Sequence, residues 1–362
     1  MTEPSTPDGP TPPTPATSSP SSTAPPSAPD PTPPTVATDS TATTPARTLG
    51  LTTFTIEGRR APALFVVGWL AVIAAAGLAS LALFGGGGTA GTVFWLLAFT
   101  AASVGLILLG GSQSLERRAA GAAYAGPSPM LVLLAAVTMT QVAGFAVGLP
   151  LQAVGASVSR PVGDLIAVAI QALVFVAVIR LMVVGAGALT WREMGVVPGR
   201  RSALRSALSG AVYAGPVIFV TTLLALAAVT VTGVVPDSPL PPTGTAAGLL
   251  AHLVAGALIA PMAEELLFRG FVLTAWQRTV GTRAAILRSS IVFVLAHVLL
   301  VGGDRFEDAL KLAFVAGVVR IPVALALGWL FVRTGSLWAS IGLHAAFNGI
   351  LITLAELGAN AV

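Results

Sequence analysis

The sequence predicts an all-α protein: a polytopic bundle of eight or nine transmembrane helices, preceded by a disordered Pro/Ser/Thr-rich tail. Three observations support this fold class. Hydrophobic residues make up 54% of the 362 residues, the mean hydropathy is +0.86, and only 9% of the residues are charged. Soluble domains carry about 25% charged residues because their surfaces are solvated. A chain with so few charges is therefore expected to lie in a lipid bilayer.

Apolar segments of about 17–25 residues, long enough to cross a bilayer, follow one another from residue 61 onward. The expected spans lie near residues 61–84, 91–111, 129–152, 163–186, 207–233, 247–275, 286–303, 309–331 and 337–357. Eight spans are the alternative, because the third span ends indistinctly near Pro150 and the eighth carries Arg320 and Pro322.

The basic residues predict the orientation in the membrane. With a cytoplasmic N-terminus, most of them fall in cytoplasmic loops, and only Arg160, Arg305 and Lys311 fall in loops on the other side. Cytoplasmic loops carry such an excess of Lys and Arg. The net charge of +4 is thus explained by an integral, multi-pass membrane protein, and no nucleic-acid partner is expected.

The chain divides into three expected regions. Residues 1–58 are a disordered tail and juxtamembrane segment, since residues 1–46 hold about half of the 27 prolines and no Lys or Arg. Such a segment cannot bury enough apolar surface to offset its ordering entropy. Residues 59–188 form N-terminal transmembrane helices, and residues 189–362 form a catalytic transmembrane region. The absence of cysteine excludes disulfides, thiolate metal ligands and a cysteine nucleophile.

The span near 247–275 carries two adjacent carboxylates, Glu264 and Glu265. A carboxylate near the bilayer centre costs about 2.5–3.5 kcal/mol to insert, so it is a functional candidate. Glu265 and Arg269 are four residues apart and are expected to pair. Glu264 points about 100° away and remains without a cation, as suits a proton acceptor or donor. The alternative is a structural ion pair beside one acid that snorkels to the interface.

Two later spans carry further polar groups at a spacing of four residues: Phe293 with His297, and His344 with Asn348. Taken singly, His297 is more typical of a hydrogen-bonded core residue, whereas His344 with Asn348 is as typical of a polar contact between helices as of a site that binds an oxyanion. A helical rise of about 1.5 Å puts Glu264 and His297 about 16 Å, and His344 about 12 Å, from the inner ends of their spans. This common depth predicts one site, with Glu264 and His297 less than about 10 Å apart so that one water can bridge them.

The ordered motifs Glu-Glu-x-x-x-Arg, Phe-x-x-x-His and His-x-x-x-Asn resemble the CPBP family of intramembrane proteases. That family comprises CAAX prenyl endopeptidases and bacterial relatives linked to bacteriocin processing or self-immunity. Residues 333–337 also resemble the family's lead-in to its last helix, so the resemblance covers about residues 190–357. It implies an intramembrane endopeptidase that acts on a membrane-associated or lipidated protein or peptide. The bacterial relatives imply a location in a bacterial cytoplasmic membrane.

The resemblance also implies roles for the residues. Glu264 with His297 would activate a water, while His344 and Asn348 would stabilise the tetrahedral oxyanion. Supporting residues would be Glu265, Arg269 and Phe293.

A zinc cofactor stays open at this stage. Glu264, His297 and His344 are suitable zinc ligands, whereas a carboxylate-activated water requires no metal. Metal-free chemistry is favoured, because a ligating His344 could no longer donate to the oxyanion. In addition, no further carboxylate is expected at this depth to orient a ligand histidine.

Two functions of other classes compete with proteolysis: a non-catalytic membrane immunity or chaperone-like protein, and a proton-coupled transporter. Intramembrane acids and histidines also form proton relays. Asn348 favours the enzyme, because an oxyanion site uses a carboxamide donor and a relay does not. The intramembrane Arg320 is expected to meet Glu265 or the substrate.

Overall fold

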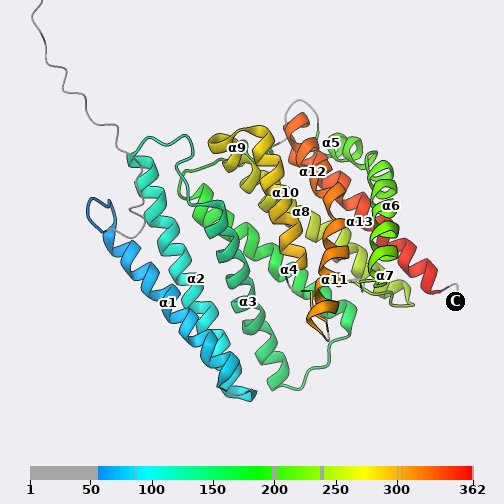
Figure 1. Ribbon diagram of the computed structural model, residues 1–362, viewed down its shortest axis with the longest axis horizontal. Coiled ribbons are helices and arrows are strands. Elements are labelled where there is room, and N and C mark those ends of the chain that lie inside the picture. Colours follow the sequence, from blue (N-terminus) through cyan, green and yellow to red (C-terminus); the bar gives the residue numbers. More distant parts are fainter. Residues whose placement is uncertain are drawn as a thin grey trace, which may run out of the picture. The chain divides into compact units, whose positions relative to one another are not determined.

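The computed structural model describes residues 56–85, 87–197, 202–236, 240–299, 301–303 and 305–360. Every described residue belongs to one compact unit, Phe54–Val362. The tail expected over residues 1–58 lies outside the described residues, apart from its last three. Throughout the described part of the chain, the regular secondary structure is helical and no strand occurs (Figure 1).

The helices follow one another with short connections. Their bounds are α1 (Pro62–Phe84), α2 (Gly88–Ala119), α3 (Pro129–Ala153), α4 (Arg160–Val178) with the π-helical η1 (Ile179–Val184), α5 (Ala203–Ala211), α6 (Ala214–Thr232), α7 (Ala246–His252), the π-helical η2 (Leu253–Ile259), α8 (Ala260–Glu265), the π-helical η3 (Leu266–Leu273), α9 (Thr274–Val280), α10 (Thr282–Val298), α11 (Phe306–Val318), α12 (Ile321–Thr334) and α13 (Leu337–Ala359).

Eight helical stretches of the described chain are long and apolar enough to cross a membrane. The predicted seventh span corresponds to α10, a shorter helix of 17 residues, so the prediction of eight or nine transmembrane helices is confirmed. That helix ends at Val298 rather than near residue 303. Gly302 and Gly303 follow, and glycine disfavours continuation of a helix.

Two spans predicted as single helices are each broken in two. The first break separates α5 from α6 ahead of Pro216, and the second separates α11 from α12 ahead of Pro322. Proline lacks the amide hydrogen that would bond the carbonyl one turn earlier, and its ring crowds that carbonyl. The second break places Arg320 at the N-cap of α12.

The bundle is held by two buried apolar clusters. The larger joins η3 to α3, α4, α10 and α12 through side chains such as Phe271 and Phe293. The smaller joins α6, α12 and α13 around Leu327 and Leu343. Figure 1 shows α1, α2 and α3 side by side, with α8, α10, α12 and α13 gathered beyond them.

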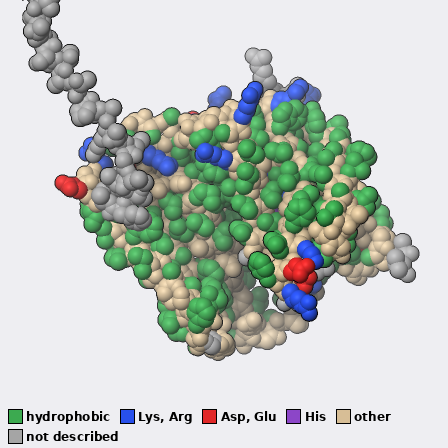
Figure 2. Space-filling view, in the orientation of Figure 1, with side chains coloured by type: hydrophobic (Ala, Val, Ile, Leu, Met, Phe, Trp, Pro, Cys, Tyr) green, Lys and Arg blue, Asp and Glu red, His purple; other side chains and the backbone are tan. Residues whose placement is uncertain are grey.

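The outer surface is the reverse of that of a soluble protein. Large apolar side chains such as Leu83 and Leu226 are exposed, and Figure 2 shows hydrophobic atoms over most of the visible face. The basic side chains visible on that face lie mostly along its upper edge. An apolar belt bordered by basic residues is the surface expected of a helix bundle in lipid.

The segment between η1 and α5 forms hydrogen bonds with α9 and with the start of α13. Gly195 and Val196 offer carbonyl oxygens to the Leu337 amide at 3.0 Å and to the Trp338 indole at 2.8 Å. Glu193 accepts from Arg278 Nη2 at 2.6 Å. The pKa of Glu193 is lowered by hydrogen bonds from the backbone N–H and the hydroxyl of Thr190, and to a smaller extent by Arg278. This segment therefore fixes α9 and the start of α13.

Glycines allow α5 and α13 to approach each other closely. A Cβ on Gly210 would collide with the backbone of Ala339, and a Cβ on Gly342 would collide with the backbone of Ala207. Small residues at such contacts are the usual basis of helix association in membranes. Since α13 carries His344, this contact also fixes the position of the site.

Gly342→Ala is expected to lower the free energy of unfolding by about 1–3 kcal/mol, because overpacking must push the two helices apart. Thermal unfolding of the protein in detergent measures this loss. Gly77→Ala is the matched control, since a Cβ on Gly77 would meet nothing within 4 Å. Equal melting temperatures for the two variants would contradict the close approach.

Candidate active site

The two glutamates lie within one continuous helix that runs from Ala246 to Val280. The π-helical segments η2 and η3 flank α8 and interrupt the α-helical register on both sides of the glutamate pair. Pro261 stands in the first turn of α8, where its missing N–H leaves a preceding carbonyl without its usual donor. Single π turns inside helices often occur at functional sites. Here they change the direction in which Glu264 and Glu265 leave the helix.

Glu265 is fully buried and is shared by two basic side chains. Its Oε1 atom accepts from Arg269 Nη1 at 2.9 Å and from His344 Nδ1 at 2.8 Å. Arg269 is fully buried as well; its Nη2 donates to the Ala324 carbonyl at 3.1 Å, and its guanidinium lies 4.4 Å from the centre of the Phe293 ring. The expected pairing of Glu265 with Arg269 is present, and it links η3 to α12 and α13.

His297 turns its Nε2 atom toward Glu264. The Nδ1 atom lies 2.8 Å from the Phe293 carbonyl oxygen, and a carbonyl only accepts, so Nδ1 carries the hydrogen. In the neutral ring the lone pair is then on Nε2, 3.7 Å from Glu264 Oε2. This distance lies well within the predicted 10 Å limit. The Phe293 ring lies 4.5 Å from the imidazole, centre to centre, and shields it on that side.

His344 is oriented in the same way by a different partner. Glu265 accepts the Nδ1 hydrogen, which leaves Nε2 at 3.9 Å from Glu264 Oε2. Both imidazoles therefore present Nε2 to one carboxylate oxygen. The side chains of Glu264 and His297 remain 13% and 28% exposed, so this point of convergence is accessible from one side. Three of the four residues predicted to be catalytic lie together.

Asn348 lies one turn further along α13. Its Nδ2 donates to the Gly256 carbonyl at 2.8 Å, so one amide hydrogen is engaged and the other is free for a second acceptor. Gly256 belongs to η2, about two turns before Glu264. Within the described chain, Asn348 forms no hydrogen bond with Glu264 or His297, and its role at an oxyanion stays a prediction.

Two further charged groups lie within the membrane-spanning segments, Arg320 and the pair His252–Asp164. Arg320 makes no contact with Glu265 among the described residues; it donates to the Ala316 carbonyl at 2.7 Å and is within electrostatic range of Glu264 and His297. A second intramembrane pair joins α7 to α4, with His252 Nε2 at 3.4 Å from Asp164 Oδ2. Sequence spacing could not reveal it, because the partners lie on different helices.

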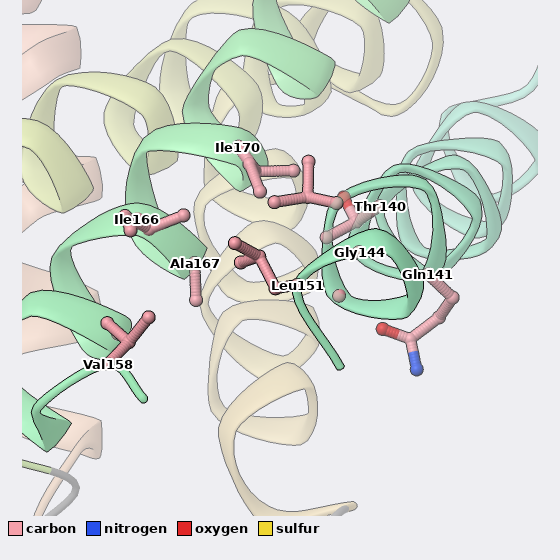
Figure 3. A pocket seen from close by; sticks show the side chains of 11 residues that line it. Thr140, Gln141, Gly144, Leu151, Val158, Ile166, Ala167 and Ile170 are labelled. Carbon is pink, nitrogen blue, oxygen red and sulfur yellow. The ribbon is translucent and has the colours of Figure 1, made fainter. Parts of the chain in front are cut away.

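A cavity of about 270 Å³ lies between α3 and α4, away from these residues. Figure 3 shows Ile166, Ile170 and Leu151 around it, with Thr140 and Gln141 as its polar neighbours. It contains no titratable side chain and none of the predicted site residues, so it offers no group for acid–base chemistry.

The residues around Glu264 fit a zinc ion in type and orientation. Both histidines have Nδ1 engaged and Nε2 directed at Glu264, as ligand histidines require. The expectation that no further carboxylate would orient a ligand histidine is wrong, because Glu265 orients His344. Ligand atoms on tetrahedral zinc lie about 3.3–3.6 Å apart, and the observed separations of 3.7 and 3.9 Å are slightly wider. No group of three His, Cys, Asp or Glu side chains close enough to hold a metal occurs in the described part of the chain.

Carboxylate and imidazole groups thus converge at one point within membrane-spanning helices. Residues 246–350 match the family model described as Rce1-like, type II CAAX prenyl endopeptidase. This segment, less than a third of the chain, runs from the start of α7 into α13 and contains every predicted site residue. The predicted resemblance to CPBP intramembrane proteases is confirmed for this region. No curated protein and no solved structure matches the chain.

Proposed function

We propose that the protein is an intramembrane endopeptidase that hydrolyses a peptide bond with a water activated by Glu264 and His297. The convergence of two Nε2 atoms on Glu264 Oε2, at 3.7 and 3.9 Å, carries this proposal. These separations are too long for direct hydrogen bonds and suit a bridging water. Such a water donates one hydrogen to Glu264 and the other to the His297 lone pair. Its own lone pair is then free to attack a carbonyl carbon.

In the proposed reaction the water oxygen bonds to the scissile carbonyl carbon, and its proton passes to Glu264. Glu264 then gives this proton to the leaving amide nitrogen as the C–N bond breaks, so that a carboxylic acid and an amine are released. His344 donates to the oxyanion from Nε2 when it is doubly protonated. Glu265 stabilises that form by accepting the Nδ1 hydrogen, and the second amide hydrogen of Asn348 supplies a further donor.

We further propose that the substrate is a membrane-associated or lipidated protein or peptide. The prenyl endopeptidases named in the family description and the membrane-spanning helices around the site support this class. The proposed catalytic region is 189–362. The distribution of basic residues supports a cytoplasmic N-terminus, and the family's bacterial relatives support a bacterial cytoplasmic membrane.

The test is cleavage of a membrane-protein pool in detergent by the wild-type protein and by Glu264→Ala, with new N-termini identified by mass spectrometry. New termini are expected with the wild type alone. If neither protein cleaves and the wild type instead carries protons into liposomes in a Glu264-dependent manner, the transporter alternative is correct. If neither cleavage nor proton transport is observed, a non-catalytic role is favoured.

Zinc remains the alternative cofactor. Glu264, His297 and His344 would hold it, and the ion would supply Lewis-acid polarisation and a more acidic water. We favour metal-free chemistry, because His344 then stays available to the oxyanion.

Chelation is accordingly expected to leave the hydrolysis rate of the purified protein unchanged, because the carboxylate alone accepts the proton. Initial rates before and after treatment with a strong zinc chelator, together with metal analysis, measure this. Three results together would overturn the metal-free version: loss of activity, recovery with stoichiometric zinc, and zinc present in the wild type but absent from His297→Ala.

A further inference from the structure

Arg320 is a positive charge inside a membrane-spanning segment. It stands between α11 and α12 in the stretch Phe306–Thr334, which is apolar enough to cross the bilayer. Arginine within the hydrocarbon region is costly and normally has a partner or reaches the interface. Arg269 has Glu265 as its partner, and the Arg180 side chain is exposed near Gly185 at the end of its span.

The guanidinium of Arg320 is largely unmatched. Among the described residues, its one hydrogen bond runs from Nη1 to the Ala316 carbonyl at 2.7 Å, and an arginine has five N–H donors. No carboxylate of the described residues forms an ion pair with it. A partly buried arginine with several free donors is suited to binding an anion from outside the chain.

The neighbours of Arg320 place it beside the candidate active site. Three residues before it, Gly317 faces Val294 and Val298 on α10, on either side of His297 in sequence. Four residues after it, the Ala324 carbonyl accepts from Arg269 at 3.1 Å. The charge of Arg320 also acts on Glu264 and His297. The free donors therefore lie close to the groups proposed to cleave the peptide bond.

We infer that Arg320 binds a carboxylate group of the substrate and so positions the scissile bond next to Glu264. This inference rests on the proposed function. The planar guanidinium matches a carboxylate with two parallel hydrogen bonds. The carboxylate is either the free C-terminus of the substrate, a few residues beyond the cleaved bond, or the side chain of an acidic residue near it.

Four fluorogenic peptides distinguish these sources. Each carries an S-prenylated cysteine and an apolar segment; one ends in a free carboxylate, and the second ends in an amide. The third is the amide peptide with one internal glutamate, and the fourth has glutamine at that position. The proteins compared are the wild type, Arg320→Gln, Arg320→Lys and the control Arg180→Gln, which removes another intramembrane arginine.

Arg320→Gln is expected to raise KM for one carboxylate-bearing peptide by about 10- to 100-fold, with kcat changed less than about 3-fold. For the uncharged peptides KM should stay as in the wild type, and any change in kcat that follows from losing the Arg320 charge near Glu264 should be the same for all four peptides. Arg320→Lys should retain part of the preference for the carboxylate, and Arg180→Gln should retain all of it. The peptide for which KM rises shows whether Arg320 binds the free C-terminus or an acidic side chain of the substrate. An equal rise in KM for charged and uncharged peptides, or no rise, would overturn the inference.

Fluorescence anisotropy with the same peptides, together with melting temperatures, covers the case in which no peptide is hydrolysed. A wild-type binding preference for a carboxylate that Arg320→Gln loses, with unchanged melting, supports the inference even though the proposed hydrolysis fails. If hydrolysis by the wild type depends on Glu264 but neither rate nor binding depends on the carboxylate, the proposed function stands and the inference fails. Absence of both hydrolysis and any carboxylate preference in binding contradicts both.

Discussion

Replacement of Glu264 by glutamine is expected to abolish peptide-bond hydrolysis and to leave the folded protein intact. Glutamine keeps the shape of the side chain but cannot accept a proton from water. General acid–base catalysis contributes about 10²–10⁴-fold, and Glu264 both takes up and delivers the proton, so a loss in kcat of about 10³-fold or more is expected. Stability should change little, since the Glu264 side chain makes no hydrogen bond within the described chain and lies 3.7 and 3.9 Å from the two imidazoles. Initial rates and melting temperatures measure the two effects.

The matched control is Glu307→Gln, on α11. Among the described residues Glu307 pairs only with the neighbouring Lys311, and it is well exposed, so both activity and melting should match the wild type. Substantial hydrolysis by Glu264→Gln would show that another group activates the water. A collapse of its melting temperature would show that Glu264 has a structural role instead.

Replacement of Glu265 by glutamine is expected to cause a large loss of stability, whereas replacement of Glu264 mainly affects activity. Arg269 would stay fully buried without its counter-charge, and breaking such a pair costs about 3–5 kcal/mol. His344 would also lose the carboxylate that accepts its Nδ1 hydrogen. Expression and thermal unfolding in detergent measure the loss.

The double variant Glu265→Gln, Arg269→Met is the control for this assignment. It removes both charges, and neutral replacement of a whole buried pair is far less costly than removal of one partner. It should therefore melt above Glu265→Gln. Equal activity and equal melting in Glu264→Gln and Glu265→Gln would contradict the division of roles between the two glutamates.

Helical periodicity explains what the sequence could predict about the site. Residues four apart share a helix face, so the pairing of Glu265 with Arg269 and the contact of the Phe293 ring with His297 could be inferred from spacing alone. The common depth of Glu264, His297 and His344 followed from the rise of each helix. Both are properties of a single helix, and a membrane-spanning helix is long enough for such spacing to hold along its whole length.

Contacts between helices could not be predicted in the same way. His344 meets Glu265 across 79 positions of sequence, and the bond from Asn348 to Gly256 spans 92. Both depend on how far each helix is rotated about its axis, which packing and the π-helical segments decide. Likewise, Pro322 predicts a break in the helix. The position of Arg320 at this break, however, depends on how α11 packs against α10.

The order in which partners are synthesised has a consequence for membrane insertion. Arg269 and Glu265 lie one turn apart on the same helix, so their charges can compensate as soon as that helix enters the bilayer. The imidazoles that face Glu264 lie on α10 and α13, and Arg320, whose charge also acts on Glu264, stands at the start of α12. All three leave the ribosome later, so Glu264 enters the bilayer before these groups have been synthesised. The last helix, which brings His344, completes the electrostatic environment of both glutamates.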